Sequence, residues 1–351
     1  MIFIFVFAGL SILIIGHEFG HFFASKIFGV EIDEFGFGYP PRIFGKKIGK
    51  TLWSINALPF GGFVKIRGEN GSEEASDTRE GKNFSNKPAL QRGAILLAGV
   101  FMNVVIGFII FTAVFMIGSP KEIVISRVSN NSPAYNAGIK ENNIIKSSLS
   151  GGESISSFTN TESFVSFVGR HISDDITLTI KDGNAISSYV LRGREHPPEG
   201  EGALGIELVS LGFERVGFFS AMYQGFQSTI DTLWQVVKAF TNLFLTIFVN
   251  PDVIKNIAGP VGIFAIAGQA GSFGFVYFLQ FLALVSLNLA VLNFIPFPAL
   301  DGGRVLMLVI EKIKGSPVSL RMQSYVNMAG FFLLIGLMLF VTFQDVTKLF
   351  K

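Results

Sequence analysis

The sequence contains no cysteine among its 351 residues. Disulfide bonds, thiolate metal ligands and cysteine nucleophiles are therefore excluded, and any bound metal must use histidine and carboxylate ligands. Charge is also scarce: 15% of the residues are charged, against about 25% in a typical soluble domain, and 49% are hydrophobic. This composition predicts a membrane protein. The net charge is +2 and no basic stripe stands out, which argues against nucleic acid as a partner.

Four segments are long and apolar enough to cross a bilayer, which takes about 20 residues. They cover residues 1–25, 93–118, 275–294 and 322–344. The first segment has neither the basic start nor the A-x-A cleavage site of a signal peptide, so we interpret it as a retained membrane helix. The sequence therefore predicts an α-helical polytopic membrane protein with four transmembrane helices.

The positions of lysine and arginine indicate the orientation of these spans. Basic residues cluster in the loops that follow the first and third spans, and none precedes the first span. The positive-inside rule then places both loops in the cytoplasm and the N-terminus outside. The long segment 119–272 is expected to be extracytoplasmic.

Three segments between the spans have recognisable patterns. Residues 30–68 are rich in glycine and aromatics and alternate like a strand, with "PFGG" (59–62) as a turn, and residues 69–88 form a polar, mobile loop. Residues 122–209 predict a small β-rich domain with strands at 122–128 and 175–180 and a closing strand at 202–208. Residues 219–244 predict an amphipathic helix, which either lies in the membrane interface or packs on the bundle; the interface is favoured.

The segment "HEFGH" interrupts the first apolar run with His17, Glu18 and His21. In a helix, residues i and i+4 share a face, so both imidazoles can reach one metal ion. Glu18 lies about 100° further round the helix, beside the metal rather than on it, which suits a general base acting on water. The alternative is a histidine pair that hydrogen-bonds inside the bundle, but it leaves a glutamate at membrane depth unexplained. The pattern favours one catalytic zinc ion.

A catalytic zinc ion takes three protein ligands and keeps one position open. The other two histidines of the chain, His171 and His196, fall in the expected outside domain. His17 lies about 24 Å along a span that starts outside, in the cytosolic part of a ~30 Å hydrocarbon core. The third span runs inwards and ends in "NFIPFPALDGG" (293–303), whose only acid is Asp301. The topology therefore predicts Asp301 as the third ligand.

The residues before Asp301 predict an irregular, polar-lined helix end. Pro296 and Pro298 break the helix, and two glycines after Asp301 let the backbone turn. We expect these two prolines, with Asn293, to contact the substrate. Irregular backbone is tolerated at membrane depth where it lines a cavity. The Asn293 amide is suited to holding the substrate backbone or an oxyanion; its alternative role is to hydrogen-bond between helices.

These motifs, in the order H-E-F-G-H, G-P-V-G-I (259–263) and N-F-I-P-F-P-A-L-D-G-G, resemble the site-2 protease family of intramembrane zinc metalloproteases, in its bacterial regulator-of-sigma-E branch. The resemblance implies one Zn²⁺ ion bound by His17, His21 and Asp301, Glu18 as the catalytic base, and a substrate role for Asn293. It implies single-span membrane proteins as substrates, such as anti-sigma factors and remnant signal peptides, and a multi-pass place in the bacterial inner membrane with the site near the cytoplasmic side. Oligomeric state stays open.

The resemblance also assigns the remaining segments. It implies a membrane-re-entrant β-hairpin that pairs with extended substrate, and an inserted extracytoplasmic PDZ-like α+β domain, of which 122–209 has room for only one copy. The expected parts are the first transmembrane helix (1–28), the hairpin and polar loop (29–92), the second transmembrane helix (93–118), the PDZ-like domain (119–211), interfacial helices and a glycine-rich segment (212–272), the third transmembrane helix with its motif (273–303), a cytoplasmic loop (304–321), and the fourth transmembrane helix with the tail (322–351).

Two other functions use the same residues. A membrane zinc transporter or sensor predicts further polar residues in spans two and four, but span two offers only Asn103 and Thr112 beyond small residues. An inactive scaffold that acts through the PDZ-like domain does not need the complete set of histidines, glutamate and aspartate. The sequence therefore favours peptide hydrolysis, with Glu18 passing a proton from water to the leaving amine.

Overall fold

The computed structural model describes residues 2–69, 82–156, 160–183, 185–247, 249–250, 258–316 and 318–349. Most of the polar loop expected at 69–88 falls outside these residues. The chain divides into two compact units, the first formed by 1–113 and 219–351 and the second by 114–218. Each unit is described separately below.

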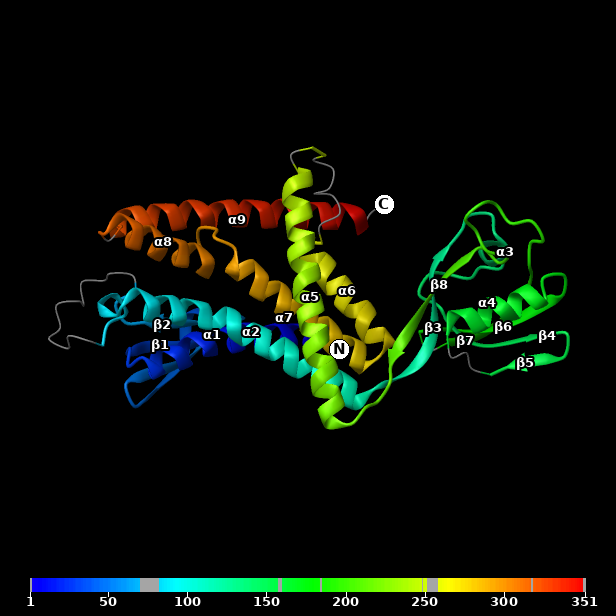
Figure 1. Cartoon of the computed structure of the whole chain (residues 1–351), viewed down its shortest axis with the longest axis horizontal. Helices are drawn as coiled ribbons and strands as arrows, with labels where there is room; N and C mark the ends of the chain where they lie inside the picture. The colour runs from blue at the N-terminus through cyan, green and yellow to red at the C-terminus, as the bar shows by residue number, and fades with distance from the viewer. Residues whose placement is uncertain are drawn as a thin grey trace. The chain divides into compact units, whose positions relative to one another are not determined.

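Among its described residues, the first unit contains four helices long and apolar enough to cross a membrane, in agreement with the four expected spans (Figure 1). Their bounds are α1 (Ile2–Ile27), α2 (Ala89–Ile117), α7 (Phe275–Phe294) and α9 (Leu320–Leu349). Val6 and Leu13 of α1 are fully buried against Phe278 and Leu282 of α7. By contrast, only 11% of the apolar window of α9 is buried. The helices α1 and α7 therefore form the interior of this unit, while α9 exposes most of its apolar surface.

A two-stranded antiparallel hairpin follows α1, formed by β1 (Ile32–Ile48) and β2 (Thr51–Ile66). Its turn lies at Gly49, where the positive φ of 62° favours glycine. The expected turn at 59–62 falls within the bounds of β2, but the register reverses there: Ile55 and Gly62 both pair with Phe37, and Trp53 and Val64 both pair with Phe35. Residues 51–55 and 62–65 therefore lie on opposite sides of 34–37 and run in opposite directions, so the chain does reverse between them, as expected.

Aromatic rings anchor the β1–β2 hairpin to α1. The Trp53 ring lies 5.4 Å from the Phe22 ring and 4.9 Å from the Phe35 ring, measured between centroids. Other apolar side chains of the hairpin are exposed, and Phe44 keeps 60% of its surface. The hairpin is thus fixed to α1 through Trp53 and Phe22, while part of its apolar surface stays open.

Two more helices of the first unit are α5 (Phe218–Ile247) and α6 (Pro260–Phe273). The expected amphipathic helix at 219–244 is confirmed as the body of α5, which leaves large apolar side chains such as Phe219 and Trp234 exposed. Helix α6 packs against α7, and its first turn meets Asp345 of α9, whose Oδ2 accepts a hydrogen bond from Gly262 N at 2.8 Å.

A helix also replaces much of the loop expected at 304–321. Helix α8 (Asp301–Lys314) is amphipathic and buries Leu308, with Val305 packed beside it. Charged residues on its other face hid this pattern in the sequence. The short 3-10 helix η2 (Phe84–Asn86) contributes Phe84 to the same cluster.

The second unit is an antiparallel sheet with two short helices. The strand order is β7-β6-β4-β3-β8, and β5 pairs with β4. Phe164 and Phe167 of a helix fill the core above buried isoleucines of the sheet. The strands expected at 122–128 and 175–180 are confirmed, whereas the closing strand begins at Ile206 rather than 202. The elements are β3 (Ser119–Val128), α3 (Pro133–Asn136), β4 (Ile144–Ser150), β5 (Glu153–Ile155), α4 (Thr161–Arg170), β6 (Asp175–Asp182), β7 (Ala185–Arg192) and β8 (Ile206–Phe213).

Candidate metal centre

His17 and His21 lie on one face of α1, as their spacing predicts, and both are buried. Asp301 is the first residue of α8 and comes to the same point from the other end of the sequence. The Asp301 Oδ2 atom lies 3.0 Å from His17 Nε2 and 3.4 Å from His21 Nε2, and the two nitrogens are 3.2 Å apart. The structure therefore brings together the three residues that the sequence nominated as metal ligands.

These separations fit a tetrahedral zinc site. Ligand atoms about 2.0–2.1 Å from a tetrahedral ion lie about 3.3 Å from one another. The Asp301 Oδ2 atom is buried without a hydrogen-bond donor, so its negative charge needs a cation. Two imidazoles and one carboxylate are also a known donor set for catalytic zinc. Residues and geometry both suit the ion.

The His21 ring is oriented from behind by α2. Its Nδ1 lies 2.9 Å from the carbonyl oxygen of Ile95, and because that oxygen can only accept, Nδ1 carries the proton. The lone pair of His21 therefore sits on Nε2, which faces Asp301. This is the tautomer that a metal ligand requires.

The His17 ring is oriented by Asn103, also on α2. Its Nδ1 lies 3.2 Å from Asn103 Nδ2, while Asn103 Oδ1 is buried without a partner. Rotating the amide by 180° exchanges the two atoms, which have nearly the same shape, and gives Oδ1 the Nδ1 proton of His17. The Ser286 hydroxyl of α7 donates a hydrogen bond to the backbone carbonyl oxygen of Asn103 at 2.8 Å, which ties α7 to this part of α2. Both histidines thus present Nε2 to the cluster.

Glycines allow α1 and α2 to approach this closely. A Cβ atom on Gly20 would lie 2.3 Å from the carbonyl oxygen of Ala98. A Cβ atom on Gly99 would lie 2.4 Å from His21 Nε2 and 2.7 Å from His17 Nε2. The space beside the two ligand nitrogens therefore exists because residue 99 has no side chain.

The turn from α7 to α8 sets the position of Asp301. Ala299 adopts a left-handed conformation with φ 73°, and a Cβ atom on Gly302 would lie 2.3 Å from the Phe294 carbonyl oxygen. On Gly303 it would lie 2.2 Å from the Phe297 carbonyl oxygen. The two glycines let the first turn of α8 pack directly on the backbone that leads into it.

A cavity of about 450 Å³ opens beside the cluster. Glu18, His21 and Asp301 line it, and the backbone of Val64 hydrogen-bonds to Glu18. Opposite, the cavity is lined by residues of β2, namely Gly62, Phe63, Val64, Lys65 and Ile66. The cavity is therefore lined by the expected base Glu18, by the expected ligands His21 and Asp301, and by part of β2.

Three expected residues are not among the described residues that line this cavity: Asn293, Pro296 and Pro298. Asn293 is half-buried near the end of α7, and Pro298 lies against Gly330 of α9. Their substrate role stays a prediction. The sequence analysis missed Gly99 and Asn103 as parts of the site, although their spacing of four residues puts them on one face of α2.

Comparison with known proteins decides the family, because residues 5–337 match peptidase family M50. This chain belongs to that family. It is 33% identical to "Putative zinc metalloprotease CPE1693" of Clostridium perfringens, over 99% of this chain and 98% of that protein. It is 26% identical to "Regulator of sigma-W protease RasP" of Bacillus subtilis, over 96% of each. It is 28% identical to "Zinc metalloprotease RasP" of Shouchella clausii, over 97% of each.

These matches confirm the resemblance to site-2 proteases and the enzyme class, a zinc metalloprotease. With four apolar helices, this M50 peptidase is an integral membrane protein. Zinc, predicted from the histidine spacing, is the metal named in its relatives.

Proposed function

We propose that this protein cleaves peptide bonds within the membrane, with one zinc ion held by His17, His21 and Asp301 and with Glu18 as the general base. The convergence of three donor atoms within 3.0–3.4 Å of one another carries the proposal. Zinc, when bound, acidifies water and polarises a carbonyl group. Glu18 faces the same cavity from the next position of α1, as a base beside the metal should.

The residues of the chain divide the remaining work. Glu18 takes a proton from the water that attacks the scissile carbonyl and returns it to the leaving amine. Ile95 and Asn103 keep the imidazoles in the ligand tautomer throughout, because each accepts a hydrogen bond from the Nδ1–H group and so holds the proton on that nitrogen. Asn293 stabilises the developing oxyanion if the end of α7 moves towards the cavity on substrate binding.

Substrate binds as an added strand along β2. A helix hides its carbonyl groups in hydrogen bonds, so a transmembrane substrate must become extended before it can be cut. Residues 62–66 of β2 pair with the start of β1 on one side, and within the described part of the chain their other edge has no strand partner. The same residues line the cavity that holds Glu18. Backbone hydrogen bonds to such an edge hold extended peptides of varied sequence.

The substrates are single-span membrane proteins, such as anti-sigma factors and remnant signal peptides, cut in regulated intramembrane proteolysis. The printed name of the Bacillus subtilis relative, a regulator of sigma-W, supports this substrate class. The N-terminus is extracytoplasmic, the site lies near the cytoplasmic face of a bacterial inner membrane, and the second unit is a PDZ-like domain outside. The basic residues after α1 and α7 support this topology.

Two variants test the site. Glu18→Gln should retain zinc and abolish cleavage of a co-expressed single-span substrate, whereas Asp301→Ala should lose both zinc and cleavage. Metal analysis and gel-based cleavage of the purified proteins give the two results. Unchanged cleavage in Glu18→Gln removes Glu18 as the base. Continued zinc transport by that variant would favour a transporter, and binding of partners without any cleavage by the wild type would favour a scaffold.

A further inference from the structure

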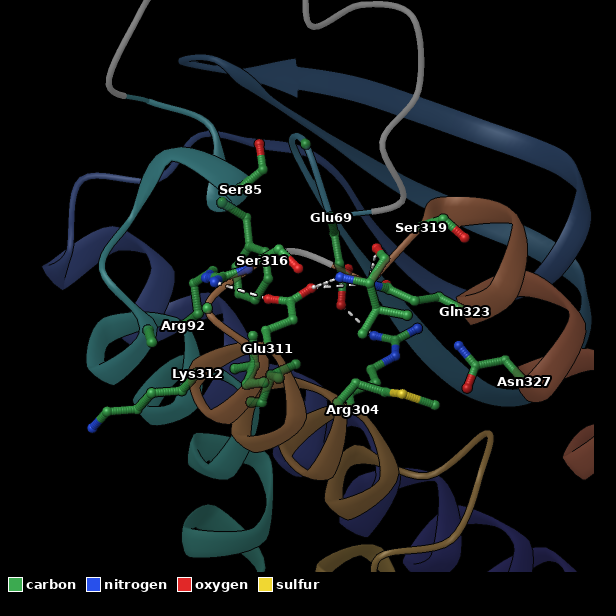
Figure 2. A pocket seen from close by; sticks show the side chains of 18 residues that line it. Glu69, Ser85, Arg92, Arg304, Glu311, Lys312, Ser316, Ser319, Gln323 and Asn327 are labelled. Carbon is green, nitrogen blue, oxygen red and sulfur yellow. Dashed lines mark hydrogen bonds and ion pairs between the residues drawn. The ribbon is translucent and has the colours of Figure 1, made fainter.

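A second, larger cavity of about 790 Å³ lies against α8 (Figure 2). Its walls come from the residues just after β2, from η2, from the start of α2, from α8, and from the segment that leads into α9 together with the first turns of α9. Figure 2 shows Arg304 and Glu311 on α8 and Glu69 on the segment after β2 turned into this space. The cavity is therefore built by several elements of the first unit and has charged groups in its wall.

Only two of the described lining residues belong to both cavities, Glu69 and Arg304. They form an ion pair between Arg304 Nη1 and Glu69 Oε1. On one side of this pair lie Glu18, His21 and Asp301, and on the other lies the larger cavity. The Glu69–Arg304 pair is thus the partition between the metal centre and the chamber.

The two arginines of the chamber are held differently. Arg92 pairs with Glu311 at 3.1 Å, and Glu311 also accepts hydrogen bonds from Gln323 and the Val318 amide. Arg304, in the described part of the chain, is held by the single carboxylate of Glu69. One arginine is locked in a network, while the other has one carboxylate partner that another carboxylate can replace.

Glu69 is suited to being replaced. Its side chain is only 12% exposed, and burial raises its pKa, which the Arg304 guanidinium opposes. A buried carboxylate that loses its arginine can take up a proton and remain in place as a neutral group. The Glu69 carboxylate therefore occupies a position in which Arg304 can bind another carboxylate.

Hydrolysis of a peptide bond creates such a ligand. The C–N bond breaks, water supplies its oxygen to the carbonyl carbon, and the N-terminal fragment leaves with a new carboxylate while the other fragment leaves with an amine. Guanidinium groups bind carboxylates through paired hydrogen bonds. Of the two products, the one with the carboxylate matches Arg304.

We propose that the larger cavity is a product chamber, in which Arg304 exchanges Glu69 for the new C-terminal carboxylate of the N-terminal cleavage fragment. This inference rests on the proposed proteolytic function. The exchange opens the partition at the moment when a product exists, so the fragment passes from the metal centre into the chamber before it leaves.

Binding of two labelled peptides tests the carboxylate site. The probes are a fluorescent leucine–alanine peptide that ends in a free carboxylate and the same peptide that ends in an amide. Each is titrated onto the full-length protein in detergent, with zinc and after zinc removal, because a bound ion would itself attract a carboxylate. The zinc-free protein should prefer the acid by about tenfold, the ratio that one charge-assisted hydrogen bond provides.

Matched variants assign that preference to Arg304. Glu69→Gln combined with Arg304→Gln removes both charges without burying one alone, and should bind the amide as the wild type does while losing the preference for the acid. Glu69→Gln alone should strengthen the preference, and Arg92→Gln should leave it unchanged. A zinc-free wild type without the preference, or a double variant that keeps it, overturns the proposal.

Turnover kinetics test the chamber itself. Met307 lines the larger cavity, whereas Val309, on the same helix, is exposed and does not line it. Met307→Trp should leave the first turnover at the wild-type rate and slow later turnovers at least threefold, and Val309→Trp should change neither. Equal steady-state rates in the two variants refute the chamber. If the wild-type protein cleaves no substrate even in a first turnover, the proteolytic function itself is refuted.

Discussion

Replacing Gly99 by alanine should remove zinc while leaving the helices in place. The added Cβ would lie 2.4 Å from His21 Nε2 and 2.7 Å from His17 Nε2. Non-bonded carbon and nitrogen atoms keep roughly 3.5 Å apart, so the His21 nitrogen must retreat by about 1 Å. Zinc–nitrogen bonds of about 2.1 Å tolerate displacements of about 0.2 Å. A methyl group at residue 99 is therefore incompatible with two histidine ligands in their present positions.

The expected loss of zinc affinity is at least about 100-fold. Replacing a residue that only hydrogen-bonds to a metal ligand already lowers metal affinity about 10–100-fold, and Gly99→Ala displaces the ligands themselves. Gly93→Ala is the matched control, because it lies in the same helix and its added Cβ meets nothing within 4 Å. Alanine is about 1 kcal/mol more favourable than glycine in a helix, and this gain is the same at both positions. The difference in zinc affinity between the two variants therefore does not come from helix propensity. Elemental analysis gives zinc per protein, and titration with a zinc chelator gives affinity. If Gly99→Ala binds zinc as tightly as the wild type, the ion does not lie beside residue 99 between His17 and His21, and the proposed metal site is refuted.

Three further predictions concern buried or paired polar groups of the first unit. Asn103→Leu should lower zinc affinity about 10–100-fold by removing the acceptor for the His17 proton, as the same chelator titration would show; an unchanged affinity would remove Asn103 from the site. Asp345→Ala should lower the free energy of unfolding by about 1 kcal/mol because Gly262 N loses its acceptor at the start of α6, measured by denaturant unfolding in detergent, with no change as the contrary result. The Lys50 ammonium lowers the pKa of Glu31, so Glu31 contributes stability above its unfolded pKa and loses it as pH falls through the lower folded value. Glu31→Gln should therefore lower the melting temperature at pH 7 and leave it equal to wild type in strong acid; an equal difference at both pH values would contradict this.

The spanning helices and the histidine pair were predictable because both signals are local. Long apolar runs define α2 and α7, and a four-residue spacing defines the ligand face of α1. Asp301 was predictable because it is the only acid in 293–303, the segment that the expected topology places level with the two histidines. Each inference needed only one stretch of sequence and the thickness of a bilayer.

The missed features depend on contacts between distant segments. Nothing near Asn103 indicates that its partner is His17, which is 86 positions earlier. Nothing near Gly99 indicates the imidazoles that exclude a side chain there. Helix α8 was missed because charges mask its apolar side until Leu308 is seen buried.

The two histidines and the aspartate are separated by almost the whole chain, and this has a consequence for biosynthesis. While the ribosome is still making the sheet of the second unit, α1, the hairpin and α2 have already been synthesised, with the two imidazoles and Glu18. The third donor of the proposed site does not yet exist, so the proposal predicts that this nascent chain neither binds zinc through three ligands nor hydrolyses peptides. The order of synthesis would therefore keep the protein inactive until the segment that carries Asp301 has been made and has packed against α1.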